Sequence, residues 1–137
     1  MSAETYLLDT SFLIDLSDEI AAKAVGPARH VARRFGENAF VSVVSIAEML
    51  EGAEDKADTV KLLTKYHVQP LGWDVAERCA LNQQRAARKG RRMGENDAFQ
   101  MAQAMVSGHT LVGCDEAFEN RPWLKYLDHR KEFAKNE

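Results

Sequence analysis

Short, mostly apolar runs alternate along the chain with longer segments in which apolar residues recur every three or four positions. The short runs are rich in β-branched and aromatic residues, which is typical of buried strands. They predict strands at residues 6–8, 39–44, 68–71 and 110–112, with a weaker fifth at 125–127. Pro70 cannot donate a backbone hydrogen bond, so the strand at 68–71 is expected at an edge of the sheet.

The longer segments predict helices, several of which begin or end at capping residues. Ser11, Ser45 and Asn96 are expected as N-caps, Pro27 lies in a first helical turn, and Gly36 follows a helix end. The predicted helices cover residues 11–16, 27–35, 45–50, 56–66, 73–88 and 96–106. Strands that alternate with helices are joined by right-handed crossovers into a largely parallel sheet covered on both faces. The sequence therefore predicts an α/β fold.

Length and composition fit one ordinary globular domain. The chain has 137 residues, of which 45% are hydrophobic and 28% charged. No apolar stretch approaches the roughly 18 residues of a membrane-spanning helix, and the N-terminus does not resemble a secretory signal. Cys79 and Cys114 lack metal-site or redox spacing, which favours a reduced compartment. We therefore expect a cytoplasmic protein with no membrane association.

Four carboxylates lie where a parallel sheet would bring them together. Asp9 follows the first strand, and Asp115 follows the strand at 110–112. Glu48 comes just after the second strand, and Asp97 opens the helix at 96–106. In open α/β sheets, ligands bind outside the carboxyl ends of the strands. The four acids are therefore expected at one rim of the sheet.

Clustered carboxylates repel one another unless protons or a cation neutralise them. The set offers only oxygen ligands, and the four histidines are scattered, which favours Mg²⁺ or Mn²⁺ over Zn²⁺. Such an ion keeps bound waters, one of which can be activated as a nucleophile against a phosphate. The chain has no phosphate-binding glycine loop, dinucleotide-binding glycine motif or nucleophile elbow. The sequence predicts metal-dependent hydrolysis.

Each acid also has an ordinary structural interpretation. Asp9 could be a turn residue, and Asp115 could begin a loop. Glu48 lies three residues after Ser45, which fits a capping box, and Asp97 would complement a helix dipole. Taken singly, these interpretations are the more frequent ones. The coincidence of all four acids at one rim favours the metal site.

A basic run precedes Asp97. Five cations and no acids occur in eight residues, namely Arg85, Arg88, Lys89, Arg91 and Arg92. The net charge is −3, but a phosphate backbone needs only a local positive surface. Basic residues also suit a helix C-terminus, so the alternative is a solvated helix end. We expect these residues to bind RNA phosphate.

At the level of motifs, the chain resembles the PIN-domain ribonucleases, and within them the short VapC-type toxins of toxin–antitoxin pairs. Leu7 to Ser11 resembles the family's first strand and first acid, with Ser11 as a supporting hydroxyl. Val44 to Glu48, Asn96 to Ala102 and Leu111 to Phe118 resemble the segments of the other three acids. The order and spacing of these motifs cover nearly the whole chain. Gly113 departs from the pattern, because many relatives carry a hydroxyl residue two places before the fourth acid.

The resemblance implies one PIN-like domain over residues 1–137, built as a three-layer α/β/α sandwich around a mainly parallel sheet. It also implies a homodimer, RNA cleavage with Mg²⁺ or Mn²⁺, and inhibition by a small antitoxin. Asp9, Asp97 and Asp115 would bind the metal, and Glu48 would bind metal or orient the attacking water. Two alternatives stay open: a PIN-fold RNA-processing nuclease without an antitoxin, and a catalytically silent RNA-binding or partner-binding module.

Overall fold

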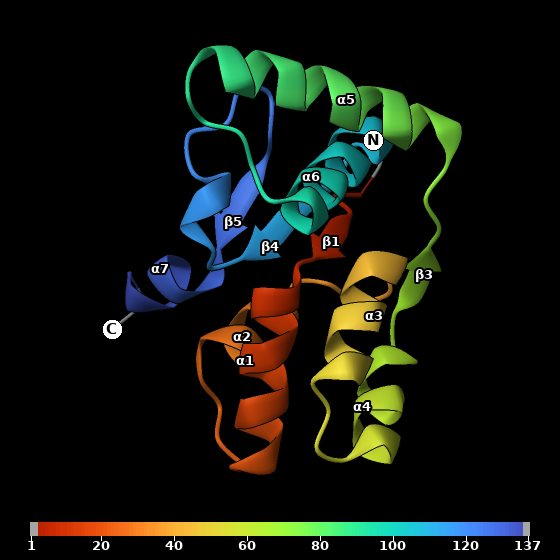
Figure 1. Cartoon of the computed structure of the whole chain (residues 1–137). Helices are drawn as coiled ribbons and strands as arrows, with labels where there is room; N and C mark the ends of the chain where they lie inside the picture. Colours follow the sequence, from red (N-terminus) through yellow and green to blue (C-terminus); the bar gives the residue numbers. More distant parts are fainter. Residues whose placement is uncertain (1–2, 136–137) are drawn as a thin grey trace.

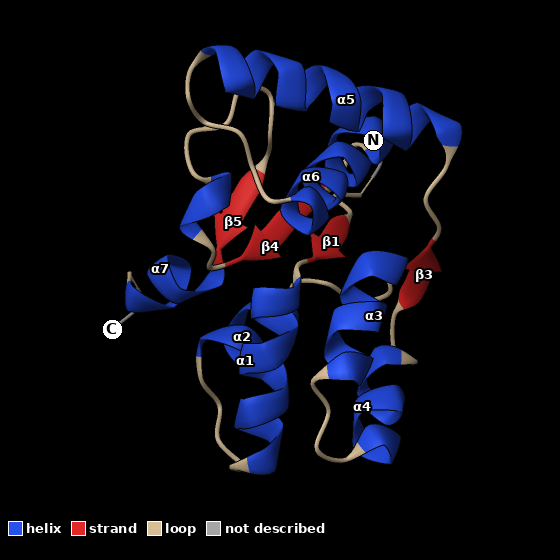
Figure 2. Cartoon of the chain, in the orientation of Figure 1, coloured by secondary structure: helices blue, strands red, loops and turns tan. Residues whose placement is uncertain are grey.

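The centre of the protein is a sheet of five parallel strands in the order β3-β2-β1-β4-β5, and this computed structural model describes residues 3–135 (Figures 1 and 2). The strands are β1 Tyr6–Leu8, β2 Ala39–Ser42, β3 His67–Gln69, β4 Thr110–Gly113 and β5 Tyr126–Asp128. The chain adds β2 and β3 on one side of β1, then β4 and β5 on the other. The predicted edge position of β3 is confirmed, and all pairings are parallel.

Helices cover both faces of this sheet. They are α1 Thr10–Ala21, α2 Pro27–Ala32, α3 Val43–Glu51, α4 Lys56–Leu63, α5 Trp73–Arg88, α6 Glu95–Ser107 and α7 His129–Ala134, with the short 3-10 helix η1 Glu116–Phe118. In Figure 1, α5 and α6 lie together on one side of the strands, while α1 to α4 lie on the other. This arrangement confirms the predicted α/β/α sandwich.

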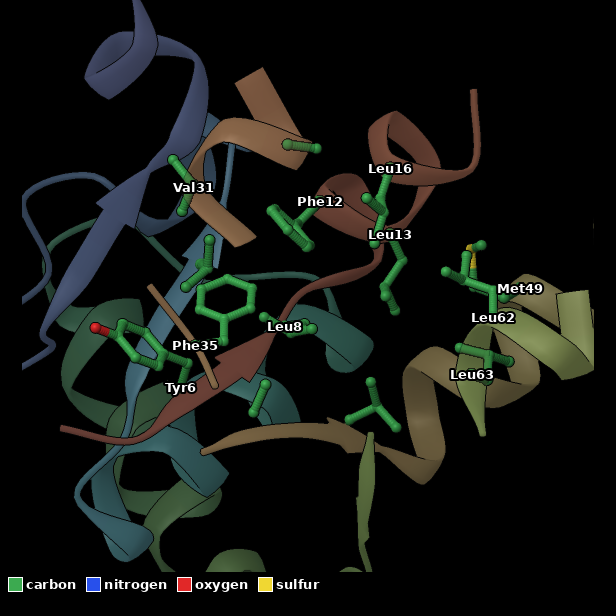
Figure 3. Close-up of a cluster of buried hydrophobic side chains, with 14 residues drawn as sticks. Tyr6, Leu8, Phe12, Leu13, Leu16, Val31, Phe35, Met49, Leu62 and Leu63 are labelled. Carbon is green, nitrogen blue, oxygen red and sulfur yellow. The ribbon is translucent and has the colours of Figure 1, made fainter. Parts of the chain in front are cut away.

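Alternation along β1 divides the core between the two layers. Tyr6 and Leu8 pack with α1 and α2, whereas Leu7 packs with α5 and α6. Figure 3 shows the first of these clusters, in which Phe12 of α1 and Val31 of α2 approach the strand. Full burial of such side chains stabilises the fold by about 1.5–3 kcal/mol each. The hydrophobic pattern of β1, buried on both faces, is what a parallel sheet requires.

Three predicted N-caps are wrong, because the observed caps lie two or three residues earlier. The observed caps are Asp9, Ser42 and Gly94 in place of Ser11, Ser45 and Asn96. The Asp9 carboxylate accepts from Ser11 N, and Ser42 Oγ accepts from Val44 N at 3.1 Å. These bonds satisfy first-turn N–H groups, and the Ser42 cap ends β2 two residues sooner than predicted.

Other boundaries also differ from the prediction. Helix α1 continues past Leu16 to Ala21, whereas α2 ends at Ala32 and leaves buried Phe35 in the following turn. Helix α7 was not predicted from the sequence. It packs on α2, where the His30 and Phe133 rings lie 5.4 Å apart. No helix among residues 3–135 is long and apolar enough to cross a membrane.

Candidate active site

The ends of β1 and β4 place two of the predicted acids next to each other. These strands are parallel neighbours with Leu8 opposite Val112, so Asp9 and Asp115 leave adjacent strand ends. The order in which the chain adds strands along the sheet reverses between β1 and β4. Open α/β sheets bind ligands at such a topological switch point. Asp97 is in the first turn of α6, and Glu48 is in the second turn of α3.

Asp9 is the most buried of the four acids. Its side chain is 2% exposed, and its Oδ2 accepts from Ser11 Oγ at 2.6 Å and from Ser11 N at 3.2 Å. Ser11 Oγ in turn accepts from Cys114 N at 3.0 Å, which ties the β4 end to the β1 end. Burial raises the pKa of Asp9, and the Ser11 hydrogen bonds oppose that rise. Ser11 thus has the supporting position predicted for it.

Asp97 is the electrostatic centre of the site. Its pKa is raised from 3.8 to about 7, first by burial and then by the charges of Asp115 and Asp9. A hydrogen bond from protonated Asp97 to Asp115 and the charge of Glu48 raise it further. The other three predicted acids therefore act on the carboxyl group of Asp97. The four residues selected from the sequence thus lie close enough for the charges of Asp9, Glu48 and Asp115 to raise the pKa of Asp97.

Glu48 is held by α1 and not by a capping box. Ser45 lies inside α3 and is fully buried, so it cannot cap the helix. Thr10 Oγ1 instead lies 2.8 Å from Glu48 Oε1 and 3.1 Å from Ser45 Oγ, and Ser45 Oγ donates to Gln100 Oε1 at 2.9 Å. The capping-box interpretation is wrong because the true cap is Ser42. Sequence reasoning missed Thr10, although it lies between Asp9 and Ser11.

Part of the ordinary structural interpretation of the other acids is correct. Asp9 caps α1, and Asp115 Oδ1 accepts from Ala117 N at 2.9 Å to cap η1. These bonds orient the carboxylates and leave further oxygen lone pairs for a ligand. Capping and metal binding are therefore compatible at both residues.

The donor set fits a hard divalent cation. No ion pair within residues 3–135 includes any of the four acids, so the protein itself does not neutralise them. Carboxylate oxygens are the ligands that Mg²⁺ and Mn²⁺ prefer. A cleft of about 430 Å³ lies against two of the acids, lined by Glu48, Gly94, Glu95, Asn96 and Asp97. The site therefore has the charge and the ligand chemistry for such an ion, with open space beside it.

A second cluster lies next to the site and was missed by sequence reasoning. Asp15, Cys114 and His129 bring their ligand atoms within 4.8 Å of one another, a convergence found nowhere else among residues 3–135. Asp15 already accepts from His129 Nε2 at 2.7 Å and from Arg130 Nε at 2.8 Å. The Arg130 hydrogen bond is the main reason that the pKa of Asp15 is lowered. We interpret the cluster as an ion-pair network that ties α7 to α1.

Close packing explains why a glycine stands at position 113, where the chain departs from the family pattern. A Cβ at Gly113 would lie 2.8 Å from Ser11 Oγ and 2.9 Å from Asp9 Oδ2. The Ser11 hydroxyl thus occupies the space into which a side chain at 113 would extend. The Ser11 hydroxyl bonds to Asp9 and to Cys114 N, whereas Asp115 takes its own support from Ala117 N.

We expect Gly113→Ala to destabilise the fold by about 1–3 kcal/mol, since the added methyl group overpacks the Ser11–Asp9 pair. Chemical denaturation in EDTA measures this. Gly52→Ala is the matched control, because its φ is −89° and the nearest atom to its Cβ is 3.6 Å away. Equal unfolding free energies for the two variants would contradict the close packing at Gly113.

The raised pKa of Asp97 predicts a pH dependence of stability in metal-free buffer. Between about 4 and about 7 the folded state holds a proton that the unfolded state has released. The resulting stability is complete below 3.8 and is lost as the pH rises through about 7. We expect the Tm of the wild type in EDTA to fall over this window more steeply than the Tm of Asp97→Asn. Parallel curves of Tm against pH for the wild type and Asp97→Asn would contradict this prediction.

The predicted basic run lies at the end of α5 and in the loop after it. Arg85, Arg88, Lys89 and Arg91 line one cleft of about 320 Å³, whereas Arg92 does not. Arg85 and Arg88 occupy the last turn of α5, so the helix-end interpretation accounts for them in part. It does not account for Arg91, which follows the helix and joins the same cleft. Arg121 and Trp123 also line it, and the sequence pattern gave no sign of either.

Comparison with solved structures places the fold among toxin–antitoxin proteins. VapBC2 from Rickettsia felis bound to a promoter DNA fragment is 17% identical with a TM-score of 0.76, covering 90% of this chain and 97% of that one. DNA-bound VapBC from Salmonella typhimurium is 20% identical with a TM-score of 0.75, covering 93% and 99%. VapBC-5 from Mycobacterium tuberculosis is 20% identical with a TM-score of 0.65, covering 91% and 98%. At these identities the likeness concerns the fold.

The sequence itself matches a family model. No curated protein matches the chain significantly. The model of the PIN domain matches residues 6–124, a span that begins at β1 and includes all four acids. The chain therefore belongs to the PIN domain family.

Proposed function

We propose that this protein is a metal-dependent endoribonuclease that uses Mg²⁺ or Mn²⁺ and serves as the toxin of a toxin–antitoxin pair. The observation that carries the proposal is the electrostatic coupling of Asp9, Glu48, Asp97 and Asp115 around one half-buried carboxyl group. A site with this charge needs a cation, and PIN domains are generally hydrolytic nucleases. Phosphodiester hydrolysis is the chemistry that follows.

Asp9, Asp97 and Asp115 would hold the metal, and Glu48 would bind metal or orient water. When bound, the metal neutralises phosphate oxygens and activates water. The chain's own contribution is positioning: Ser11 fixes Asp9, and Thr10 holds Glu48 Oε1. Among residues 3–135, Glu48 Oε2 receives no such hydrogen bond, so it can accept a proton from the attacking water.

The toxin assignment rests on the fold neighbours, several of which are toxin–antitoxin complexes. A small antitoxin is the partner we propose, with a homodimeric toxin in the cytoplasm. A PIN-fold RNA-processing enzyme would cleave RNA without such a partner, and a silent binding module would not cleave it. Incubating the purified protein with RNA in Mn²⁺ and in EDTA separates the nucleases from the module. Absence of Mn²⁺-dependent cleavage would reject the proposal.

Glu48→Gln tests the role of the acid whose interpretation was most open. We expect cleavage in Mn²⁺ to fall at least about tenfold, because glutamine cannot take up a proton or neutralise a metal. Stability should change little, since the glutamine oxygen can still accept from Thr10 Oγ1. RNA cleavage rates and Tm are measured together. Glu51→Gln, at the exposed end of the same helix, is the control, and full activity of Glu48→Gln would remove Glu48 from the mechanism.

A further inference from the structure

A basic cleft is lined by residues from the C-terminal end of α5 and from the loop that joins η1 to β5. Figure 1 shows these two segments near each other. Five cations line it: Arg85, Arg88, Lys89, Arg91 and Arg121. Its apolar lining includes Met93, Met101 and the indole of Trp123, which is 78% exposed. The cleft volume of about 320 Å³ is at the lower end of the range for ligand sites.

The positive charge of this basic cleft is not neutralised by the protein. None of its five cations takes part in an ion pair within residues 3–135. Burial and the nearby charge of Arg91 lower the pKa of Arg121, as expected for cations that face each other without an anion between them. Gathering like charges costs free energy, so the cleft has the electrostatics of a polyanion site.

Hydrogen bonds to backbone carbonyls keep the basic cleft in shape. The Arg91 guanidinium donates to Glu119 O at 3.1 Å and Asn120 O at 3.3 Å, and Arg121 donates back to Arg91 O at 2.6 Å. The Gln83 side-chain amide donates to Met93 O at 2.8 Å and accepts from Met93 N at 3.0 Å. Arg91 and Arg121 therefore act as structural clamps. Within the described part of the chain, residues 3–135, the side chains of Arg88 and Lys89 make no such hydrogen bond and are left for a ligand.

Trp123 is presented to solvent in an unusual way. Its φ is +61°, a left-handed conformation that bulky residues rarely adopt. The guanidinium carbon of Arg85 lies 5.7 Å from the centre of its ring. An exposed aromatic ring among unpaired cations is the combination that proteins use for single-stranded nucleic acid, where bases stack and phosphates meet cations. An acidic peptide would use the cations but would leave the indole without a stacking partner.

We propose that the basic cleft is a single-stranded RNA subsite in which an unpaired base stacks on Trp123 and the adjoining phosphates meet Arg88 and Lys89. The choice of RNA rests on the proposed function. Both walls of the cleft are close in sequence to the acids. Asp97 follows Met93 by four residues, and Asp115 precedes Asn120 by five. A strand held here would thus be anchored beside the segments that carry the candidate active site.

The test uses the full chain in EDTA, where binding is observed without metal-dependent cleavage. In Trp73→Phe the only tryptophan is Trp123, so its fluorescence reports on the cleft. The probe is a single-stranded RNA hexamer, compared with an abasic hexamer of equal charge. We expect the RNA hexamer to quench the fluorescence of Trp123 and to bind about tenfold more tightly than the abasic hexamer. This difference is within the range for stacking of one base. Equal binding of the two hexamers, or an unresponsive Trp123, would overturn the proposal.

Two further variants separate stacking from charge. Trp123→Ala should weaken hexamer binding about tenfold and keep its salt dependence, whereas Trp73→Ala, which removes the other exposed indole, should change neither. Replacing Arg88 and Lys89 together by glutamine should lower the salt slope by about 1.4, for two phosphates on a single strand. Equal quenching by a poly-glutamate peptide would assign the cleft to a protein partner and reject the RNA subsite.

The same protein is assayed for RNA cleavage in Mn²⁺. Cleavage together with an unresponsive Trp123 would reject this subsite and leave the nuclease intact. Base-dependent quenching without cleavage would reject the nuclease and leave a nucleic-acid-binding cleft.

Discussion

Asp97→Asn is expected to reduce Mn²⁺-dependent RNA cleavage by more than about a hundredfold while the protein remains folded. Loss of a residue that merely orients a metal ligand typically costs 10–100-fold, so loss of a ligand should cost more. The fold should not suffer, because in metal-free buffer the ionised Asp97 carboxyl is repelled by Asp115, Asp9 and Glu48. Removing that charge relieves the repulsion. Cleavage rates in Mn²⁺ and Tm values in EDTA give both quantities.

Asp9→Asn should behave in the same way, because asparagine can still cap α1 and accept from Ser11. Asp58→Asn is the matched control. Asp58 is in the first turn of α4, just as Asp97 is in the first turn of α6, but Asp58 is exposed. It tests whether loss of a helix-dipole charge alone affects cleavage. Near-wild-type cleavage by Asp97→Asn or Asp9→Asn would remove that residue from the site. An equal loss in Asp58→Asn would point to a general effect on folding.

The position of the acids could be predicted because it follows from topology. Asp9 and Asp115 come directly after apolar runs, and parallel strands must place such residues at one edge of the sheet. Glu48 was expected at this rim, but its local interpretation was wrong, because the helix is capped by Ser42 and not by Ser45. Ser45 is instead inside the helix, and its hydroxyl donates to Gln100 across the core. A contact between residues 55 positions apart leaves no local signal.

The basic cleft shows the same limit. The charges of Arg88 and Lys89 are visible in the sequence, and their run suggested a phosphate site. The contribution of Trp123 is not visible, because it depends on left-handed backbone at Asn120 and Trp123 and on the hydrogen bonds of Arg91 to that loop. Helix α7 was not predicted for a related reason. Its buried residue His129 is polar, and only the structure shows that Asp15 lies opposite it.

The acidic cluster that we propose as a metal site also suits a particular form of inhibition. An Arg or Lys placed among the four acids would pair with the carboxylates that are proposed to bind metal. A guanidinium would thus relieve the repulsion that raises the pKa of Asp97. Short segments that fold on binding can deliver such a residue.

We therefore expect expression of this chain alone to arrest the growth of a host cell, through cleavage of cellular RNA. Co-expression of the product of an adjacent small gene should restore growth, because the inhibitor would compete with metal for the four acids. The measurement is growth after induction of wild type, of Asp9→Asn, and of wild type with the neighbouring gene, with soluble protein verified in each case. Unimpaired growth with soluble wild-type protein would reject the toxin and favour an RNA-processing enzyme. Arrest by Asp9→Asn would be more damaging, because toxicity would then be independent of the carboxylate site.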